Sequence, residues 1–332
     1  MEYGGCLHFE LNNKGQDYYY EYSDNRIDVD SGRSALQYIL NKFRIKRIWL
    51  PIYNCPTVEQ RIINVSEIDI EWYNISTQFT PVIDYKKLKM GDAVLWVNYF
   101  GVMKNSTIDE VVEIQKATDA IVIIDNIPAY FSKPRMDVIN MYSCRKFIGV
   151  PDGGHIIGGV IEPEKLTTYS TAENYMYLLS AIEEGSNCAY EGYKKSEQRF
   201  NDSREAYGMP ALTQKILYNV DYQRIKDVRR KNYLYIDSML NKANGIKLIL
   251  EDGTVPLIYP YLTENITLRE KLIENHIYVS RFWKCVLSNP LANEFEKRLA
   301  EYLIPLPLDQ RYGEEEINNM VNLVKKLEQE TR

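Results

Sequence analysis

Two side chains with complementary chemistry lie between residues 123 and 154. Asp125 directly follows the apolar run 120–124, and a second run ends with Ser143 and, three residues later, Lys146. A lysine amine becomes a nucleophile toward carbonyl groups when its surroundings lower its pKa, and a buried carboxylate needs a partner. Because open α/β sheets bind ligands beyond the carboxyl ends of their strands, these two residues indicate a site.

Each of the two residues also has an ordinary structural explanation. Lys146 could lie on the surface, and Asp125 could accept hydrogen bonds in the turn after its strand. A protonated pyridine nitrogen is another partner for such a carboxylate, as in pyridoxal enzymes. The glycine-rich turn region 149–154 that follows Lys146 favours a site over a plain surface lysine.

An anion site is predicted upstream, at the start of the helix that begins in the sequence DSGRSAL, residues 30–36. Ser31 is a suitable N-cap, and Gly32 lets a ligand approach the free N–H groups of the first turn. An ordinary capped helix is the alternative. A phosphate at Gly32–Ser34, a ring nitrogen at Asp125 and an aldehyde at Lys146 are together what a pyridoxal phosphate site requires.

The elements that must position these residues form an alternating pattern. Near-continuous apolar strands that alternate with helices predict a mostly parallel sheet covered on both faces. Residues 1–30 are polar, tyrosine-rich and predicted to be irregular. The predicted strands are 47–51, 68–73, 92–100, 120–124 and 155–163, and the predicted helices are 57–63 and 107–117.

The pattern changes in the second half of the chain. Residues 171–243 have helical periodicity and almost no strand signal. Beyond them we predict strands at 246–250, 255–262 and 277–279, an extended segment at 304–308, and helices at 266–275, 292–302 and 313–329. The expected organisation is a large cofactor-binding α/β domain, residues 1–220, and a small α+β domain, residues 221–332.

Composition argues against several classes of protein. The net charge of −6 disfavours a general nucleic-acid binder, although a local basic patch is compatible with it. Five unclustered cysteines without a CxxC pair, and three widely separated histidines, disfavour a metal site. We find no signal peptide and no apolar run of the roughly 18–20 residues that a membrane helix needs, so we expect a cytoplasmic protein.

The order of these segments resembles the DegT/DnrJ/EryC1/StrS family of sugar aminotransferases, which have the aspartate-aminotransferase-like fold of pyridoxal phosphate (PLP) enzymes. SGRSAL resembles the family's phosphate-binding helix start. IIDNIPAYF resembles its strand with the pyridine-binding aspartate, and YSCRKFIGVPDGG resembles its segment with the Schiff-base lysine. The likeness spans about residues 30–328.

The resemblance implies roles for individual residues. Lys146 and Asp125 would be catalytic, the first as the cofactor's lysine and the second as the partner of its ring nitrogen. Gly32, Arg33, Ser34 and Ser143 would bind the phosphate. Tyr53 is our candidate for the residue that stacks on the ring, but alignment on Pro51 would place Cys55 there instead.

Three departures from the family pattern concern the surroundings of the cofactor. Ser143 and Lys146 are three residues apart, where the family usually has five. Pro128 stands where the family commonly has Gln or His. Ala206 occupies the position of an asparagine that the family often sends to the phosphate of the partner subunit.

The function that the resemblance implies is transamination from an amino donor, by family habit glutamate, to a keto-sugar, most often nucleotide-linked, in polysaccharide or aminosugar biosynthesis. A pyrophosphate would need cations at the mouth of the site, and the family fold implies a homodimer. Two alternatives remain open: a PLP-fold protein with a binding or regulatory role, and a different PLP-dependent reaction. The candidate cations are Arg229, Arg230, Lys231, Arg281 and Lys284.

Overall fold

An eight-stranded sheet forms the larger part of the computed structural model, which describes residues 9–11, 15–65, 67–159, 161–185 and 187–330. The strand order is β1-β8-β7-β6-β5-β2-β3-β4. The strands are β1 (Arg26–Val29), β2 (Arg47–Pro51), β3 (Asp69–Ile75), β4 (Pro81–Val82), β5 (Asp92–Val97), β6 (Ile121–Asp125), β7 (Ile139–Ser143) and β8 (Gly154–Ile157).

The centre of the sheet is parallel and its edges are antiparallel. β3, β2, β5, β6 and β7 pair in parallel, and β8, β1 and β4 add antiparallel neighbours. β5 is buried along its whole length, as expected for a strand covered on both faces. The predicted fold class, a mostly parallel α/β sheet, is confirmed.

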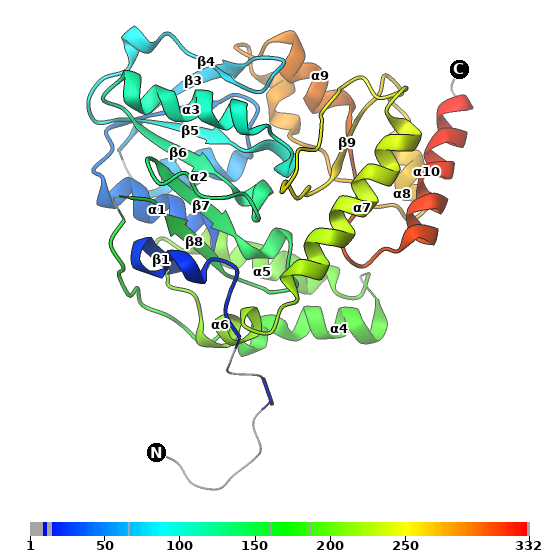
Figure 1. The fold of residues 1–332 in the computed structure, drawn as a ribbon, viewed down its shortest axis with the longest axis horizontal. Coiled ribbons are helices and arrows are strands. Elements are labelled where there is room, and N and C mark those ends of the chain that lie inside the picture. Colours follow the sequence, from blue (N-terminus) through cyan, green and yellow to red (C-terminus); the bar gives the residue numbers. More distant parts are fainter. Residues whose placement is uncertain (1–8, 12–14, 66, 160, 186, 331–332) are drawn as a thin grey trace, which may run out of the picture.

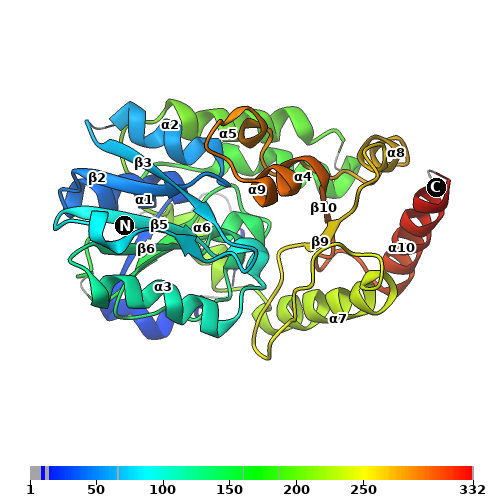
Figure 2. The same cartoon turned by 90° about the horizontal axis from the view of Figure 1, so that it is seen from above.

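Helices lie on both sides of this sheet (Figures 1 and 2). In Figure 2, α2 lies on one side and α3 on the other. The helices of this part are α1 (Gly32–Lys42), α2 (Pro56–Val65), α3 (Asn105–Ala117), α4 (Met176–Glu184), α5 (Tyr190–Asp202) and α6 (Ala211–Leu217).

The long helix α7 (Tyr222–Leu240) leads into a second, smaller group of elements (Figure 1). A two-stranded antiparallel sheet of β9 (Tyr259–Leu262) and β10 (Leu303–Leu306) is packed with α8 (Leu268–Glu274), α9 (Glu294–Tyr302) and α10 (Glu314–Gln329). The short helix η7 (Lys284–Ser288) precedes α9. The domain boundary at residue 220 stays a prediction.

Four local predictions were wrong. Residues 246–250 and 277–279 form no strand, and Ile249 is 65% exposed, so the apolar residues of the first segment have no sheet to join. β9 begins only at Tyr259. Residues 26–29 form strand β1, which was predicted to be irregular. This strand forms because it pairs with β8, which lies more than a hundred residues away in the sequence.

Candidate active site

The ends of two adjacent parallel strands and the start of α1 surround one cavity. Asp125 ends β6, Ser143 ends β7, and Lys146 ends the short helix η5 (Cys144–Lys146) that follows. The cavity has a volume of about 390 Å³, and Gly32, Arg33, Asp125, Ser143 and Lys146 all line it. Five of the seven predicted site residues therefore meet around one space.

Asp125 is a buried carboxyl, 5% exposed. Its Oδ1 accepts the backbone N–H of Ile127 at 2.9 Å, and within the described residues no ion pair joins it to a cation. Burial raises its pKa to about 7, although the Ile127 N–H and the charge of Lys146 act in the opposite direction. Such a carboxyl is suited to pairing with a cationic N–H of a ligand.

Lys146 lines the cavity, and its side chain is accessible from that space. Protein surrounds the cavity and therefore encloses the amine. This enclosure, followed by the charge of Arg145, lowers its pKa, while Glu197 acts in the opposite direction. A lysine with a lowered pKa has more of its amine in the neutral, nucleophilic form.

The first turn of α1 is capped as predicted. Ser31 Oγ accepts the N–H of Ser34 at 3.2 Å. A Cβ added to Gly32 would lie 2.2 Å from Cδ1 of Ile127, so glycine allows the turn after Asp125 to pack closely against this helix start. Ser34 does not line the cavity. Its hydroxyl oxygen accepts the N–H of Tyr207 at 3.4 Å and belongs to the cap.

Tyr53 lies outside the set of residues that line the cavity, and Cys55, from the alternative alignment, belongs to it. The Tyr53 side chain is completely buried, with its ring 4.8 Å from that of Trp283 and 5.7 Å from that of Tyr99. Which side chain would stack on a cofactor ring stays a prediction, but Cys55 and Trp283 are the ones that reach the cavity.

Two of the residues that depart from the family pattern lie near this site. Pro128 lines the cavity. Ala206 is partly buried just before Tyr207–Met209, a segment that runs beside β1 and the cap of α1, with the N–H of Asp30 donating to the carbonyl of Tyr207 at 2.9 Å.

Arg145 and Glu197 line the cavity and were not singled out from the sequence. Arg145 directly precedes Lys146, and Glu197 comes from α5, about fifty residues further along the chain. Glu197 accepts hydrogen bonds from Arg145 and from Arg33. A single acidic residue on a helix forms no short sequence motif. Glu197 is therefore recognised as a site residue only from the position of α5 in the structure.

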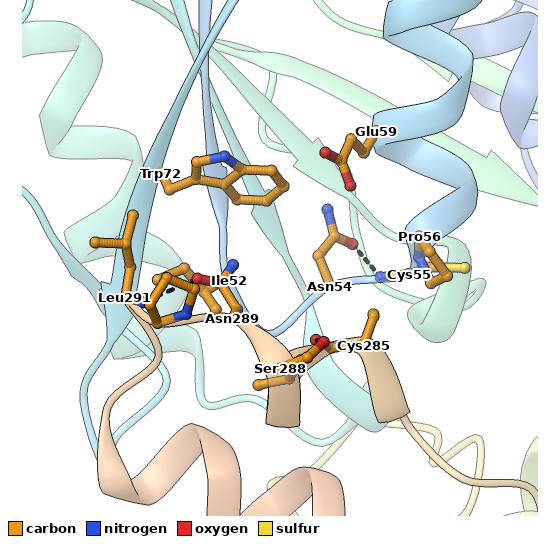
Figure 3. A pocket seen from close by; sticks show the side chains of 12 residues that line it. Ile52, Asn54, Cys55, Pro56, Glu59, Trp72, Cys285, Ser288, Asn289 and Leu291 are labelled. Atoms are coloured by element: carbon orange, nitrogen blue, oxygen red, sulfur yellow. Dashed lines mark hydrogen bonds between the residues drawn. The ribbon is translucent and has the colours of Figure 1, made fainter.

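A second cavity of about 390 Å³ adjoins the first and shares Asn54 and Cys55 with it (Figure 3). Trp72 presents its ring to this space, and the side chains of Asn54 and Glu59 point toward one another beside it. Asn289 and Leu291 lie on the opposite wall. The wall therefore combines an aromatic face with amide and carboxylate groups.

The five candidate cations do not line either of these cavities. Arg229 is buried and donates to the carbonyl groups of Pro256 and Leu257, and Arg230 donates to the carbonyl group of Glu251. Lys231 pairs with Glu314 on the surface at 3.1 Å. Arg281 and Lys284 flank Phe282 and Trp283, which line the first cavity.

Neither a metal-ion cluster nor a membrane-spanning helix is found in the described part of the chain. Among those residues, no group of three or more His, Cys, Asp or Glu side chains is arranged to hold a metal ion. No helix there combines the length and the apolar character that crossing a bilayer requires.

Comparison with solved structures identifies the fold. The aminotransferase TlmJ from Streptoalloteichus hindustanus superposes with a TM-score of 0.66 at 14% identity, over 95% of this chain and 89% of its own. The sugar aminotransferase CalS13 from Micromonospora echinospora gives 0.62 at 13% identity, over 92% and 89%. Spr1654 from Streptococcus pneumoniae, in its PMP form, gives 0.64 at 15% identity, over 94% and 90%.

The chain has the fold of the sugar aminotransferases. The fold expected from the family resemblance is thereby confirmed along nearly the whole chain. The likeness lies in the structure, because no protein-family model and no curated protein sequence matches the chain.

Proposed function

We propose that the chain is a PLP-dependent aminotransferase, a divergent member of the DegT/DnrJ/EryC1/StrS family, that transfers an amino group from glutamate to a nucleotide-linked keto-sugar. The observation that carries the proposal is the meeting of Asp125, Lys146 and the start of α1 around one cavity. Sugar aminotransferases of the same fold support it, among them Spr1654, which has both a PLP and a PMP form.

The residues of the cavity fit the cofactor. Asp125 is a buried carboxyl without an ion pair among the described residues, and it would accept the N–H of the pyridine ring. Lys146 would hold the aldehyde carbon. The backbone N–H groups at Gly32 and Arg33, with the Ser143 hydroxyl, would bind the phosphate. When bound, PLP supplies a ring that accepts the electron pair of the bond broken at the donor's α-carbon.

The chain's own residues then have distinct tasks. The amine of Lys146 would remove the proton from the donor's α-carbon and would return a proton to the carbon that carries the transferred nitrogen. Its lowered pKa favours the base form needed for the first task. The Asp125 carboxylate would hold the proton of the ring nitrogen when the cofactor is bound.

The second cavity is the proposed place for the acceptor sugar. An aromatic ring covers the apolar face of a sugar, and amide and carboxylate groups bond to its hydroxyls. Trp72, Asn54 and Glu59 provide these groups next to the cavity of Lys146. For a diphosphate attached to the sugar, the candidate partners are Arg281 and Lys284, which flank Phe282 and Trp283 but do not line either cavity.

The visible absorption spectrum tests the cofactor and the donor together. Purified protein reconstituted with PLP should show the band of a lysine-bound cofactor, and glutamate should bleach it. Lys146→Ala should lose the band, and the exposed control Lys116→Ala should keep it. Protein that stays colourless with added PLP would contradict the proposal, and a band that persists in Lys146→Ala would show that another lysine holds the cofactor.

The acceptor cavity has its own test in steady-state kinetics with a nucleotide-linked keto-sugar. Trp72→Ala should raise KM for the sugar about two- to tenfold, because a stacked ring contributes roughly 0.5 to 1.5 kcal/mol beyond its buried area. The half-reaction with glutamate should keep its rate. An unchanged KM for the sugar would place the acceptor elsewhere.

The fold supports a homodimer that works on small molecules in the biosynthesis of polysaccharides or aminosugars. Exposed apolar side chains on α4, with Met176, Leu179 and Ile182 at 60%, 51% and 82% exposure, provide a face that a second copy could cover. We place the reaction in the cytoplasm, where nucleotide-linked sugars are made.

A further inference from the structure

A cluster of two arginines and one glutamate forms part of the wall of the cavity that contains Lys146. Arg33 comes from the first turn of α1, Arg145 from η5, and Glu197 from α5, and their side chains are 15%, 12% and 27% exposed. Glu197 Oε2 accepts from Nη2 of Arg33 at 3.2 Å, and its Oε1 accepts from Nη2 of Arg145. Three distant segments therefore build one charged group.

The hydrogen bonding of this cluster is incomplete. The buried Nε atoms of Arg33 and Arg145 have no acceptor among the described residues. Nε and Nη2 of a guanidinium face the same edge, and together they match the two oxygens of a carboxylate. Glu197 bridges the two arginines with one oxygen each, so it uses only half of each edge. Each arginine therefore retains one unpaired N–H donor within the wall of the cavity.

The charges of the cluster are also unbalanced. Two guanidinium groups face one carboxylate, which leaves one positive charge on the cavity wall. Arg199, the third arginine beside Phe200, does not change this balance, because it pairs with Asp152 at 3.7 Å and does not line the cavity. One uncompensated charge matches a ligand group that carries a single negative charge, such as a carboxylate.

The position of Arg145 suggests which carboxylate this is. Arg145 is the neighbour of Lys146, and its guanidinium lies over the ring of Phe200 at 4.6 Å, which fixes its plane. The proposed amino donor reacts at the place that Lys146 vacates, and its carboxylate is attached to the same carbon as its amino group. Arg145 lines the same cavity as Lys146, so its guanidinium is a candidate partner for a carboxylate on that carbon.

We propose that the guanidinium of Arg145 binds the carboxylate of the amino donor, and that Glu197 holds this guanidinium in place until the donor arrives and then pairs with Arg33 alone. This inference rests on the proposed transamination and adds to it the recognition of the donor. The cofactor's phosphate remains at the start of α1 and Ser143. Arg145 is then a specificity residue that distinguishes amino acids from amines without a carboxylate.

The test uses PLP-loaded protein and glutarate, a dicarboxylate without an amino group that can bind but cannot react. Glutarate should perturb the visible band of the loaded wild type in a saturable way. Arg145→Gln should keep the band and bind glutarate at least about tenfold more weakly. The control Arg224→Gln, on the exposed side of α7, should bind glutarate like the wild type.

Two further variants separate charge from shape and test Glu197. Arg145→Lys keeps the charge but loses the planar edge, so glutarate should bind several-fold more weakly than to the wild type. Glu197→Gln removes the competing carboxylate, so glutarate should bind several-fold more tightly. If Arg145→Gln does not fold, the other two variants still test the proposal. It is overturned if Arg145→Lys binds glutarate as tightly as the wild type, or if Glu197→Gln binds it more weakly.

The remaining outcomes are equally informative. Wild-type glutarate affinity in Arg145→Gln overturns the assignment. Arg145→Gln could instead lose affinity for PLP but not for pyridoxal, and bind glutarate normally at each site that holds the cofactor. This result would assign Arg145 to the cofactor's phosphate. Wild-type protein without the visible band would refute the proposed function, whereas a band with normal glutarate binding in all variants refutes only the inference about Arg145.

Discussion

At the scale of residues, the protein moves the pKa values of its two central groups in opposite directions. Burial raises the pKa of Asp125 to about 7, and enclosure together with Arg145 lowers the pKa of Lys146. Both shifts reduce charge at neutral pH in a cavity without a ligand. The site is therefore prepared for a ligand that brings a cationic N–H to the carboxyl and a carbonyl carbon to the amine.

Asp125 should make the stability of the cofactor-free protein depend on pH. A carboxyl whose folded pKa exceeds its usual 3.8 stabilises the fold below that usual value, and this contribution is lost as pH rises through about 7. The free energy of unfolding of the wild type should fall relative to Asp125→Asn by up to about 4 kcal/mol between pH about 4 and 7.5.

Urea unfolding at several pH values measures this difference, with Asp119→Asn, an exposed carboxyl, as the control that should follow the wild type. Parallel curves for the wild type and Asp125→Asn would mean that Asp125 is ionised in the empty cavity.

Lys146 of the cofactor-free protein should react faster than Lys116 with an acylating reagent at pH 7. Its lowered pKa leaves more neutral amine than at Lys116, whose pKa is raised by the hydrogen bond with Glu113. Each unit of pKa separation gives up to about tenfold more neutral amine. Peptide mass spectrometry over time compares the two sites, and faster labelling of Lys116 would contradict the lowered pKa of Lys146.

At the scale of elements, the turn after β5 joins the sheet to the C-terminal part of the chain. Gly101 has φ +70°, and the N–H of Leu257 donates to the carbonyl of Phe100 at 2.8 Å. A Cβ on Gly101 would lie 2.7 Å from the carbonyl oxygen of Val255 and 2.8 Å from that of Pro128. Glycine here lets the segment 255–257 close one side of the cavity.

Gly101→Ala should therefore destabilise the protein by more than the backbone conformation alone explains. Gly253 also has a positive φ, +79°, but a Cβ there would meet no atom within 4 Å. We expect the free energy of unfolding to fall by about 1 kcal/mol in Gly253→Ala. In Gly101→Ala it should fall by at least about 3 kcal/mol, because backbone atoms around the new Cβ must move. Urea unfolding measures both, and equal losses would show that segment 255–257 yields easily.

At the scale of the whole molecule, the apolar face of α4 is the surface on which we expect the proposed homodimer to form. Met176, Leu179 and Ile182 lie at a spacing of three residues on one side of the helix, and all three are exposed in the single chain. Burying such side chains in an interface contributes roughly 1.5 to 3 kcal/mol each. An obligate interface commonly has a more apolar core than the rest of the surface.

Sedimentation of the double variant Leu179→Lys/Ile182→Lys tests this face. The wild type should sediment as a dimer, and the double variant should dissociate at least about a hundredfold more readily. Leu234→Lys, which changes an exposed leucine of α7, is the matched control. A double variant that remains as dimeric as the wild type would place the interface on another face.

The sequence by itself determined the elements whose apolar patterns are continuous and whose ends are marked by capping residues. The strands that end at Asp125 and Ser143, the start of α1 at Ser31–Gly32 and the last helix were all predictable, because local burial and capping leave local patterns. The five predicted residues that meet in the cavity follow from these ends.

Only the tertiary structure decided what depends on distant partners. β1 is a strand because β8 lies beside it, and residues 246–250 are not a strand because no strand in the described part of the chain pairs with them. Glu197 reaches Arg145 because α5 packs against η5, a contact between segments about fifty residues apart in the chain. Long-range pairing and charge compensation have no signature in one segment, so the cluster that we assign to the donor's carboxylate became visible only in the fold.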